Sequence, residues 1–369
     1  MLVKKLSEAF GVSGHEEPVR ALILEEIRGR VDECRVDGVG NLIARKKPAE
    51  GRGQGSASAS GHGAPLRVLL AAHMDEVGLM ITQVEDSGML RFAKVGGIDD
   101  RILPARAVLI GDARVPGVIT FKPVHLTEKS ERDLVVPYKQ LAIDIGASTR
   151  AEAEKLVSRG DYATFDVPFV ELSGEGSAWR TVQGKAFDDR AGCAILAELL
   201  KERYPFELSA AFTVQEEVGL RGAQVAAYAE SPDAAVVLEC TGANEVPTKR
   251  DVSPSTRLGA GPAITIMDRS FIADQRLVRH FVAAAERLAI PCQFKQPNIG
   301  GTDAGSIHRS RSGVPAITVA VPCRYIHAPA GIMNMNDFDA TVTLVREALA
   351  GLPDAMTGRG DDEGMRRRT

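Results

Sequence analysis

The chain has 369 residues, of which 44% are hydrophobic and 25% charged, enough for one large domain with its own core and a second, smaller domain. Lys and Arg number 45 against 49 Asp and Glu, so the formal charge is −4 and gives no reason to expect nucleic acid or an anionic membrane as the main partner. We expect a globular protein that acts on a small molecule or a peptide.

The amino terminus, MLVKKLSEAFGVSGHEEP, has no apolar stretch long enough for a signal-peptide core, and no segment is continuously apolar over about 18 residues. We therefore predict a cytoplasmic protein without a membrane partner. The five cysteines are far apart and lack CxxC spacing, which favours reduced thiols over disulfides or a thiolate zinc site. A bound metal would then be held by His, Asp and Glu.

Helical spacing of apolar residues predicts helices at residues 2–10 and 16–31, the second with a Ser-x-x-Glu capping box formed by Ser13 and Glu16. The stretch 48–65 is rich in Gly, Ser and Ala, so we predict a disordered loop there.

The LRVLLAA run of residues 66–72 is short and apolar throughout most of its length, as expected for a strand buried on both faces. From residue 77 to 168 the pattern changes to short β-like pieces broken by Gly and Pro, followed by a helix-like stretch at 148–158. This block is predicted to be an inserted, mainly β domain.

From residue 189 onward helical and strand patterns alternate, which is typical of an α/β domain. The predicted helices are 194–200, 222–228, 275–288 and 338–349, and the predicted strands are 208–214, 234–238, 263–266 and 316–321. The predicted fold is thus a helix-covered mixed sheet, formed by residues 1–76 and 169–369, with the β domain of residues 77–168 inserted.

Acidic residues and histidines follow the apolar strands, where ligands gather in open α/β sheets. The strand at 66–72 runs into His73 and Asp75, and residues two apart in an extended segment point to one side. His73 can therefore bind a metal while Asp75 accepts its other ring N–H. Taken alone, such a pair is more often a structural histidine.

Two segments carry adjacent carboxylates. In GKAFDDRAG, Asp189 fits an ordinary helix N-cap, whereas Asp188 precedes the cap and could bridge two cations. In QEEVG, Glu216 and Glu217 follow the strand at 208–214. A solvated acidic pair is the common explanation, but at the end of a buried strand carboxylates need a compensating cation or hydrogen bonds.

Two more strands end in the same chemistry, the strand at 234–238 in Glu239 and the strand at 316–321 in CRYIH, which contains His327. The order HMD, GKAFDDRAG, QEEVG, an acidic residue and YIH resembles the tetrahedral-particle metallo-aminopeptidases, named glutamyl, leucyl or lysyl aminopeptidases and in some relatives CelM-like endoglucanases. The segments GVSGHEEPVR, VGGIDDR, KPVHL, IDIGA and GGTDAG extend the resemblance over nearly the whole chain.

The resemblance implies a site with two metal ions. His73 and Glu239 would hold one ion, Glu217 and His327 the other, and Asp188 would bridge them. Typical members have Asp where Glu239 stands, so this position departs from the pattern.

The resemblance also implies roles for neighbouring residues: Glu216 as general base, Asp75 orienting His73, and a cis peptide bond between Asp188 and Asp189. Two cations roughly 3.5 to 4 Å apart can clamp a water, lower its pKa and polarise the scissile carbonyl. Nitrogen and oxygen ligands suit zinc or cobalt. Glu216 can then take the proton of the water and pass it to the leaving amine.

GGTDAG supplies three further candidates, Gly301, Thr302 and Asp303, for the substrate pocket, with Asp303 facing the free amino group; a glycine turn that caps the next helix explains the motif equally well. The predicted function is a metal-dependent aminopeptidase of peptides, assembled as a homo-oligomer between a dimer and a dodecamer. The alternatives are a related metal-dependent deacylase or amidohydrolase, and a non-catalytic peptide-binding assembly subunit. A glycosidase is disfavoured, because adjacent carboxylates do not flank a sugar bond.

Overall fold

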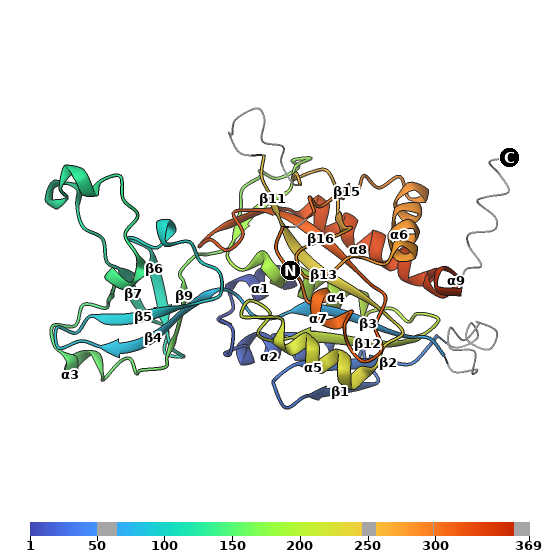
Figure 1. Cartoon of the computed structure of the whole chain (residues 1–369), viewed down its shortest axis with the longest axis horizontal. Helices are drawn as coiled ribbons and strands as arrows, with labels where there is room; N and C mark the ends of the chain where they lie inside the picture. Colours follow the sequence, from blue (N-terminus) through green and yellow to red (C-terminus); the bar gives the residue numbers. More distant parts are fainter. Residues whose placement is uncertain (50–64, 246–255, 298, 358–369) are drawn as a thin grey trace.

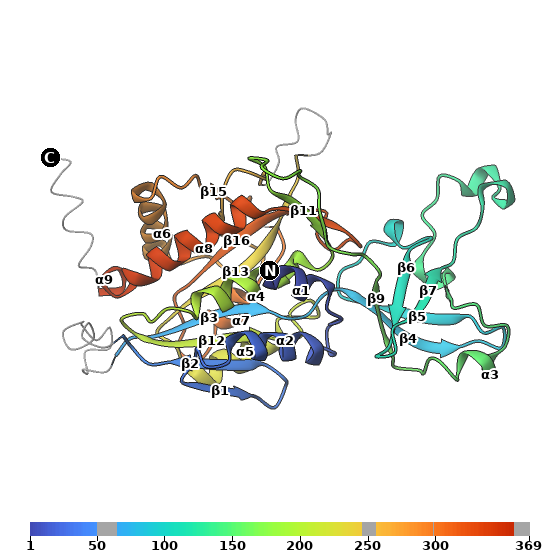
Figure 2. The same ribbon diagram turned by 180° about the vertical axis from the view of Figure 1, so that it is seen from behind.

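The computed structural model describes residues 1–49, 65–245, 256–297 and 299–357. It contains a body built on one mixed sheet and, beside it, a closed β-barrel (Figures 1 and 2). The predicted fold class, a helix-covered mixed sheet with a separate mainly β unit, is confirmed. The loop predicted at 48–65 lies almost entirely outside the described residues.

The body uses eleven strands and eight helices among the described residues. The strands are β1 (Glu33–Val36), β2 (Leu42–Lys46), β3 (Arg67–His73), β10 (Val170–Glu171), β11 (Thr181–Gly184), β12 (Glu207–Thr213), β13 (Ala234–Ala243), β14 (Ala263–Thr265), β15 (Gln293–Phe294), β16 (Ala316–Arg324) and β17 (Gly331–Asn334). The helices are α1 (Leu2–Glu8), α2 (Glu17–Ile27), α4 (Phe187–Leu199), α5 (Arg221–Glu230), α6 (Gln275–Arg287), α7 (Ala304–Ile307), α8 (Met335–Ala350) and α9 (Leu352–Thr357).

The sheet has the order β1-β2-β12-β3-β13-β16-β17-β11-β10, and β14 and β15 pair beside β16. Its central strands β12, β3, β13 and β16 are parallel. Helix α4 packs on β3 and β13 and contacts α1 and α8, whereas α5 and α7 lie on the other face of the sheet (Figures 1 and 2). Because both faces are covered, these strands are apolar along nearly their whole length, as β3 shows with six of its seven residues buried.

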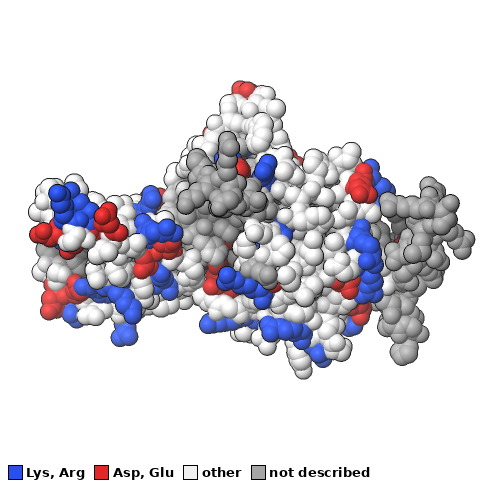
Figure 3. Space-filling view, turned by 45° about the horizontal axis from the view of Figure 1, so that its top comes forward, with Lys and Arg blue, Asp and Glu red and all other residues white. Residues whose placement is uncertain are grey.

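The barrel lies between residues 78 and 165, with the strand order β4-β5-β8-β7-β6-β9. Its elements are β4 (Gly78–Val84), β5 (Leu90–Val95), β6 (Ala107–Ile110), β7 (Val115–Ile119), β8 (Ile143–Asp144), α3 (Arg150–Ala153) and β9 (Tyr162–Phe165), together with the 3-10 helices η1 (Asp100–Ile102), η2 (Val124–Leu126), η3 (Lys129–Glu131) and η4 (Tyr138–Gln140). A hydrophobic cluster around Leu79, Leu90 and Ile143 fills it, separate from the core of the body. Basic and acidic residues are interspersed over its surface (Figure 3).

Several local predictions were wrong. Ser13 does not cap α2: its hydroxyl donates to Asp75, and the N-cap Glu16 makes no side-chain capping bond. The helix predicted at 148–158 is only the four-residue α3. Strand β13 does not end before Glu239 but continues to Ala243, because its pairing with β16 continues that far.

The strands β11 and β17, which no apolar run indicated, pair with each other in the sheet. The five cysteines are free thiols, as predicted. Among the described helices, none combines the length and the hydropathy that crossing a membrane would require.

Candidate metal centre

The candidate centre lies where the sheet divides. After β3 the chain adds β12 on one side of it and β13 on the other, an arrangement that opens a crevice at the carboxyl ends of the strands. The β3–β13 pairing ends at Ala71 and Val237, two residues before His73 and Glu239. These two side chains therefore stand level with each other at the point where the strands separate.

His73, the last residue of β3, faces a group of carboxylates with its Nε2 atom. That atom lies 3.3 Å from Asp188 Oδ1, 3.7 Å from Glu239 Oε2 and 4.0 Å from Glu216 Oε2. Its Nδ1 atom lies 3.1 Å from the backbone carbonyl of Asp75 and 3.5 Å from the Asp75 carboxylate. Because a carbonyl can only accept, Nδ1 carries a proton, and Nε2 is the ring nitrogen that faces the carboxylates of the cluster.

His327 forms a second group on the other side of the cluster. Its Nε2 atom lies 3.3 Å from Asp188 Oδ2 and 3.4 Å from Glu217 Oε1. Its Nδ1 donates to the carbonyl of Gly97, 3.1 Å away, in the VGGIDDR segment that follows β5. The loop after a barrel strand thus orients a side chain of the centre.

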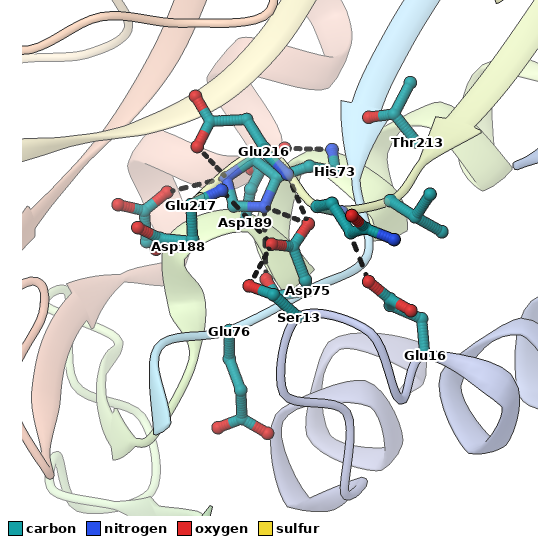
Figure 4. Close-up of polar contacts among 12 residues, drawn as sticks. Ser13, Glu16, His73, Asp75, Glu76, Asp188, Asp189, Thr213, Glu216 and Glu217 are labelled. Atoms are coloured by element: carbon teal, nitrogen blue, oxygen red, sulfur yellow. Dashed lines mark hydrogen bonds and ion pairs between the residues drawn. The ribbon is translucent and has the colours of Figure 1, made fainter. Parts of the chain in front are cut away.

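Asp188 stands between the two groups, because its Oδ1 lies nearest His73 and its Oδ2 nearest His327. Figure 4 shows Asp188 beside His73. The peptide bond between Asp188 and Asp189 is cis, as expected. Asp189 accepts from the backbone N–H of Gly192 at 2.8 Å, which is the geometry of the predicted N-cap, and also from the N–H of His73 at 3.2 Å.

Asp75 does more than face His73. Its two carboxylate oxygens accept from the backbone N–H groups of Glu216 and Glu217, at 3.0 and 3.1 Å, and one of them also accepts from the Ser13 hydroxyl at 2.6 Å (Figure 4). Asp75 therefore fixes the turn that carries both glutamates. Sequence reasoning missed Ser13, because its contact lies 62 residues away along the chain.

The electrostatics of the cluster are those of crowded buried acids. Burial, together with neighbouring negative charges, raises the pKa of Glu216 and Glu239 well above the usual value, and burial raises the pKa of Glu217 to about 7. Burial alone would lower the pKa of His73, but the charges of Glu239 and Glu216 raise it well above its usual value.

The donor set fits divalent cations. Single donor atoms of three sets lie within 4.8 Å of one another: His73, Glu216 and Glu239; Asp188, Glu217 and His327; Asp188, Asp189 and Glu239. Over the described residues, the ion pairs of these carboxylates are all with the two histidines, never with Lys or Arg. Buried carboxylates of this number are costly unless bound cations or protons balance their charge.

A cavity of about 350 Å³ opens onto the cluster. Gly301 and Thr302 line its wall, as does Lys295, which sequence reasoning missed. Asp303 is buried behind this wall, where its carboxylate accepts from the Thr213 hydroxyl. It is not among the residues that line the cavity.

Comparison with known proteins shows that the chain is similar to aminopeptidases. Residues 53–344 match the M42 glutamyl aminopeptidase family. The chain is 30% identical to the lysyl aminopeptidase of Pyrococcus furiosus over 359 residues, 95% of this chain and 96% of that protein. The structure is similar to the TET aminopeptidase of a marine sediment archaeon, Thaumarchaeota archaeon, with a TM-score of 0.88, 35% identity and coverage of 97% and 98% of the two chains.

A second solved structure is the Pyrococcus horikoshii TET1 peptidase, which can assemble into a tetrahedron or a large octahedral shell. It is 36% identical, with a TM-score of 0.79 and coverage of 94% and 98% of the two chains. The chain therefore belongs to the M42 glutamyl aminopeptidase family and is a peptidase.

Proposed function

We propose that the protein is a metal-dependent aminopeptidase that releases residues from the amino termini of peptides with two divalent ions, zinc or cobalt, per subunit. The observation that carries the proposal is the position of Asp188. Its two oxygens lie 3.3 Å from Nε2 of His73 and 3.3 Å from Nε2 of His327, so one carboxylate stands between two sets of donors.

In this proposal His73 and Glu239 hold one ion, Glu217 and His327 hold the other, and Asp188 bridges them. When bound, such a pair of ions lowers the pKa of a water and polarises the scissile carbonyl. Nitrogen and oxygen donors without thiolate suit zinc or cobalt. The longer arm of Glu239, where Asp is typical, makes it the ligand that departs most from the pattern.

Glu216 is the proposed general base. It lines the cavity beside His73, and a carboxylate with a raised pKa is suited to take a proton from water and return it to the leaving amine. Asp75 is a positioning residue, since it holds the backbone of Glu216 and lies against Nδ1 of His73. By holding the backbone of both residues, it would keep the side chains of Glu216 and Glu217 pointing in different directions.

The cavity favours a substrate with a free amino terminus. Carboxylates at its inner end attract an ammonium group, and a blocked amine would bring no charge to offset them. Gly301 and Thr302 form part of the proposed substrate wall. A direct contact of Asp303 with the amino group stays a prediction.

The barrel, residues 77–168 in our division of the chain, is the proposed unit of assembly and substrate access. The segment between β7 and β8 carries exposed apolar side chains that a subunit contact would cover, among them Phe121, Val124, Leu126, Leu134 and Val135. With the assembly of the Pyrococcus horikoshii relative, this supports a homo-oligomer.

The test is a panel of aminoacyl p-nitroanilides and peptides, each offered to metal-free protein and to protein restored with zinc or cobalt. We expect cleavage only after restoration, two ions bound per chain, and no cleavage of N-acetylated counterparts. Preferred cleavage of the acetylated substrates would replace the proposal with a deacylase. Full activity of the metal-free protein would refute the metal centre.

A further inference from the structure

The turn at residues 268–271, between β14 and α6, is organised by one buried carboxylate. Asp268 is 4% exposed, and its Oδ1 atom accepts from the backbone N–H groups of Ser270 and Phe271, at 2.6 and 3.0 Å. Bonds of this kind, to residues two and three positions ahead, are the means by which Asp fixes a turn.

The same carboxylate also holds the segment 300–302, which lines the cavity that opens onto the candidate metal centre. The Ser270 hydroxyl donates to Oδ1 of Asp268 at 2.7 Å, and its oxygen accepts from the backbone N–H of Thr302 at 3.3 Å. The Thr302 hydroxyl donates to Oδ2 of Asp268, also at 3.3 Å. Asp268 therefore reaches this cavity wall by two routes, one through Ser270 and one directly to Thr302.

Two glycines of the GGTDAG motif bring the wall and the turn into close contact. A Cβ atom on Gly305 would lie 2.3 Å from Cβ and 2.4 Å from Oγ of Ser270, closer than non-bonded atoms approach. Gly300 has a φ of 66°, in the left-handed region that favours glycine, and its carbonyl accepts from the N–H of Arg269 at 2.9 Å. The motif thus packs against the turn on one side while it lines the cavity on the other.

Asp268 lies behind the wall and is not among the residues that line the cavity. Thr302 does line it, although only 3% of this residue is exposed, and its hydroxyl also lies 3.2 Å from that of Thr318 on β16. The wall is therefore held from behind. A displacement of about 1 Å in such a substrate-positioning element can lower an enzymatic rate by about 10²-fold.

We propose that Asp268 is a positioning residue for substrate binding, which acts through Ser270 and Thr302 to hold the wall 300–302 against the substrate. This inference rests on the proposed aminopeptidase function, in which this wall is part of the substrate site. The metal ligands and the base lie outside this network, so loss of Asp268 should weaken substrate binding while both ions stay bound.

The test measures kcat, KM and metal content of the metal-restored protein, with the aminoacyl p-nitroanilide that the wild type cleaves best. For Asp268→Ala we expect kcat/KM to fall about 10- to 100-fold, mainly through a higher KM, with two ions per chain. Asp268→Asn keeps an oxygen that can accept from the turn and should restore most of the wild-type value. Ser270→Ala removes one route only and should raise KM less.

A double-mutant cycle separates positioning from a general loss of stability. Thr302→Val keeps the shape of the side chain and removes its hydroxyl. Because residues in one network are not additive, adding this change to Asp268→Ala should raise KM by no more than about twofold further. The control is Asp274→Ala, which removes the N-cap of α6 and its bonds to Arg276 and Leu277 and should leave KM as in the wild type.

The outcomes distinguish the two proposals. If the wild type cleaves no substrate of the panel, the aminopeptidase function fails. If the wild type is active and Asp268→Ala keeps its KM, the function stands and the positioning role is wrong. Full additivity with Thr302→Val, an equal rise of KM in Asp274→Ala, or loss of metal from Asp268→Ala would each overturn the role as well.

Thermal unfolding of each variant shows whether it is folded at the assay temperature. If Asp268→Ala does not fold, Ser270→Ala decides the question. A raised KM in that variant with both ions bound supports the role, and an unchanged KM overturns it.

Discussion

Two neighbouring residues, Asp75 and Glu76, belong to two different buried clusters of acidic side chains. The negative charges of the two clusters have different partners within the chain. Glu76 is buried against Lys185, whose Nζ lies 2.6 Å from its carboxylate, and Arg190, whose Nη2 lies 3.3 Å away. The Thr164 hydroxyl donates to it as well, at 3.0 Å. This cluster holds its own cations.

Asp75 points the other way, toward the candidate metal centre (Figure 4). There, within the described structure, the carboxylates pair with imidazoles alone. A short segment supplies both clusters, since Asp188 and Asp189 stand between Lys185 and Arg190. Buried acids that pair with Lys and Arg of the same chain stabilise the fold, whereas the buried acids without such partners are, in our proposal, the ligands of added cations.

The largest effect should come from Glu216→Gln, which tests whether Glu216 of the candidate metal centre acts as the general base and not as a metal ligand. Loss of the base should lower kcat by about 10²- to 10⁴-fold, while both ions remain bound. Turnover and metal content per chain are the measurements. An unchanged kcat, or loss of metal from this variant, would contradict the assignment of Glu216 as a base outside the ligand set.

A matched pair of variants tests the comparison itself. Glu76→Gln leaves Lys185 and Arg190 buried without their acid, and should lower the free energy of unfolding by about 3 to 5 kcal/mol with or without metal. Asp188→Asn removes a carboxylate that faces two histidines but also several like charges, so it should lower the stability of the metal-free protein by less than Glu76→Gln does, while abolishing stabilisation by zinc. Denaturant unfolding in chelator and in excess zinc measures both. A similar response of the two variants would break the comparison.

The pH dependence of the metal-free protein should show which cluster lacks cations. Burial raises the pKa of Glu217 from 4.5 to about 7. Burial by itself would lower the pKa of His327, but the neighbouring carboxylates of Asp188 and Glu217 raise it from 6.5 to about 9. Between about pH 5 and 9 the native state thus binds more protons than the unfolded chain, so stability falls as pH rises.

The expected loss is several kcal/mol over this window, because the pKa of each of the two groups is raised by more than two units and one unit corresponds to about 1.4 kcal/mol. Solvent screening at the partly exposed His327 keeps the loss below the full sum. Bound zinc takes the place of these protons and should remove the loss. Thermal unfolding at pH 5, 7 and 9, with chelator and with zinc, provides the measurement. If the stability in chelator does not change between pH 5 and 9, the charges of these acids are already compensated within the chain, contrary to this prediction.

The smallest effect is expected at Glu239, where the chain departs from the typical residue. Glu239→Asp keeps the carboxylate but draws it back from His73, so one ion should bind more weakly by up to about tenfold, or about 1.4 kcal/mol. The ion at Glu217 and His327 serves as the internal reference in a competition titration with a chelating dye. Equal weakening of both ions would contradict the proposed division of ligands.

Much of this architecture could be predicted because its signals are local. The apolar run before His73 and the apolar run before the acidic pair Glu216 and Glu217 both indicate buried strands, and parallel strands bring their carboxyl ends together. The roles that the resemblance implies for these residues remain to be tested by the variants above.

The contacts that could not be predicted are long-range. The backbone of Glu216 meets Asp75 across 141 residues, and no spacing in the sequence signals this bond. The Ser13 hydroxyl looked like a helix cap because the capping motif is short and common. Lys295 carries no motif at all, and only its burial in the cavity distinguishes it from a surface lysine.

The hydrogen bond between Gly97 and His327 has a consequence for how this chain can change over evolution. Because a backbone carbonyl makes it, no single side-chain substitution at position 97 removes the acceptor, although a Cβ there would come within 3.2 Å of the imidazole. The loop after β5 and the imidazole that it orients are therefore expected to change together. If the barrel is exchanged between relatives, we therefore expect a functional site only when the loop that contains Gly97 is kept together with the body that carries His327.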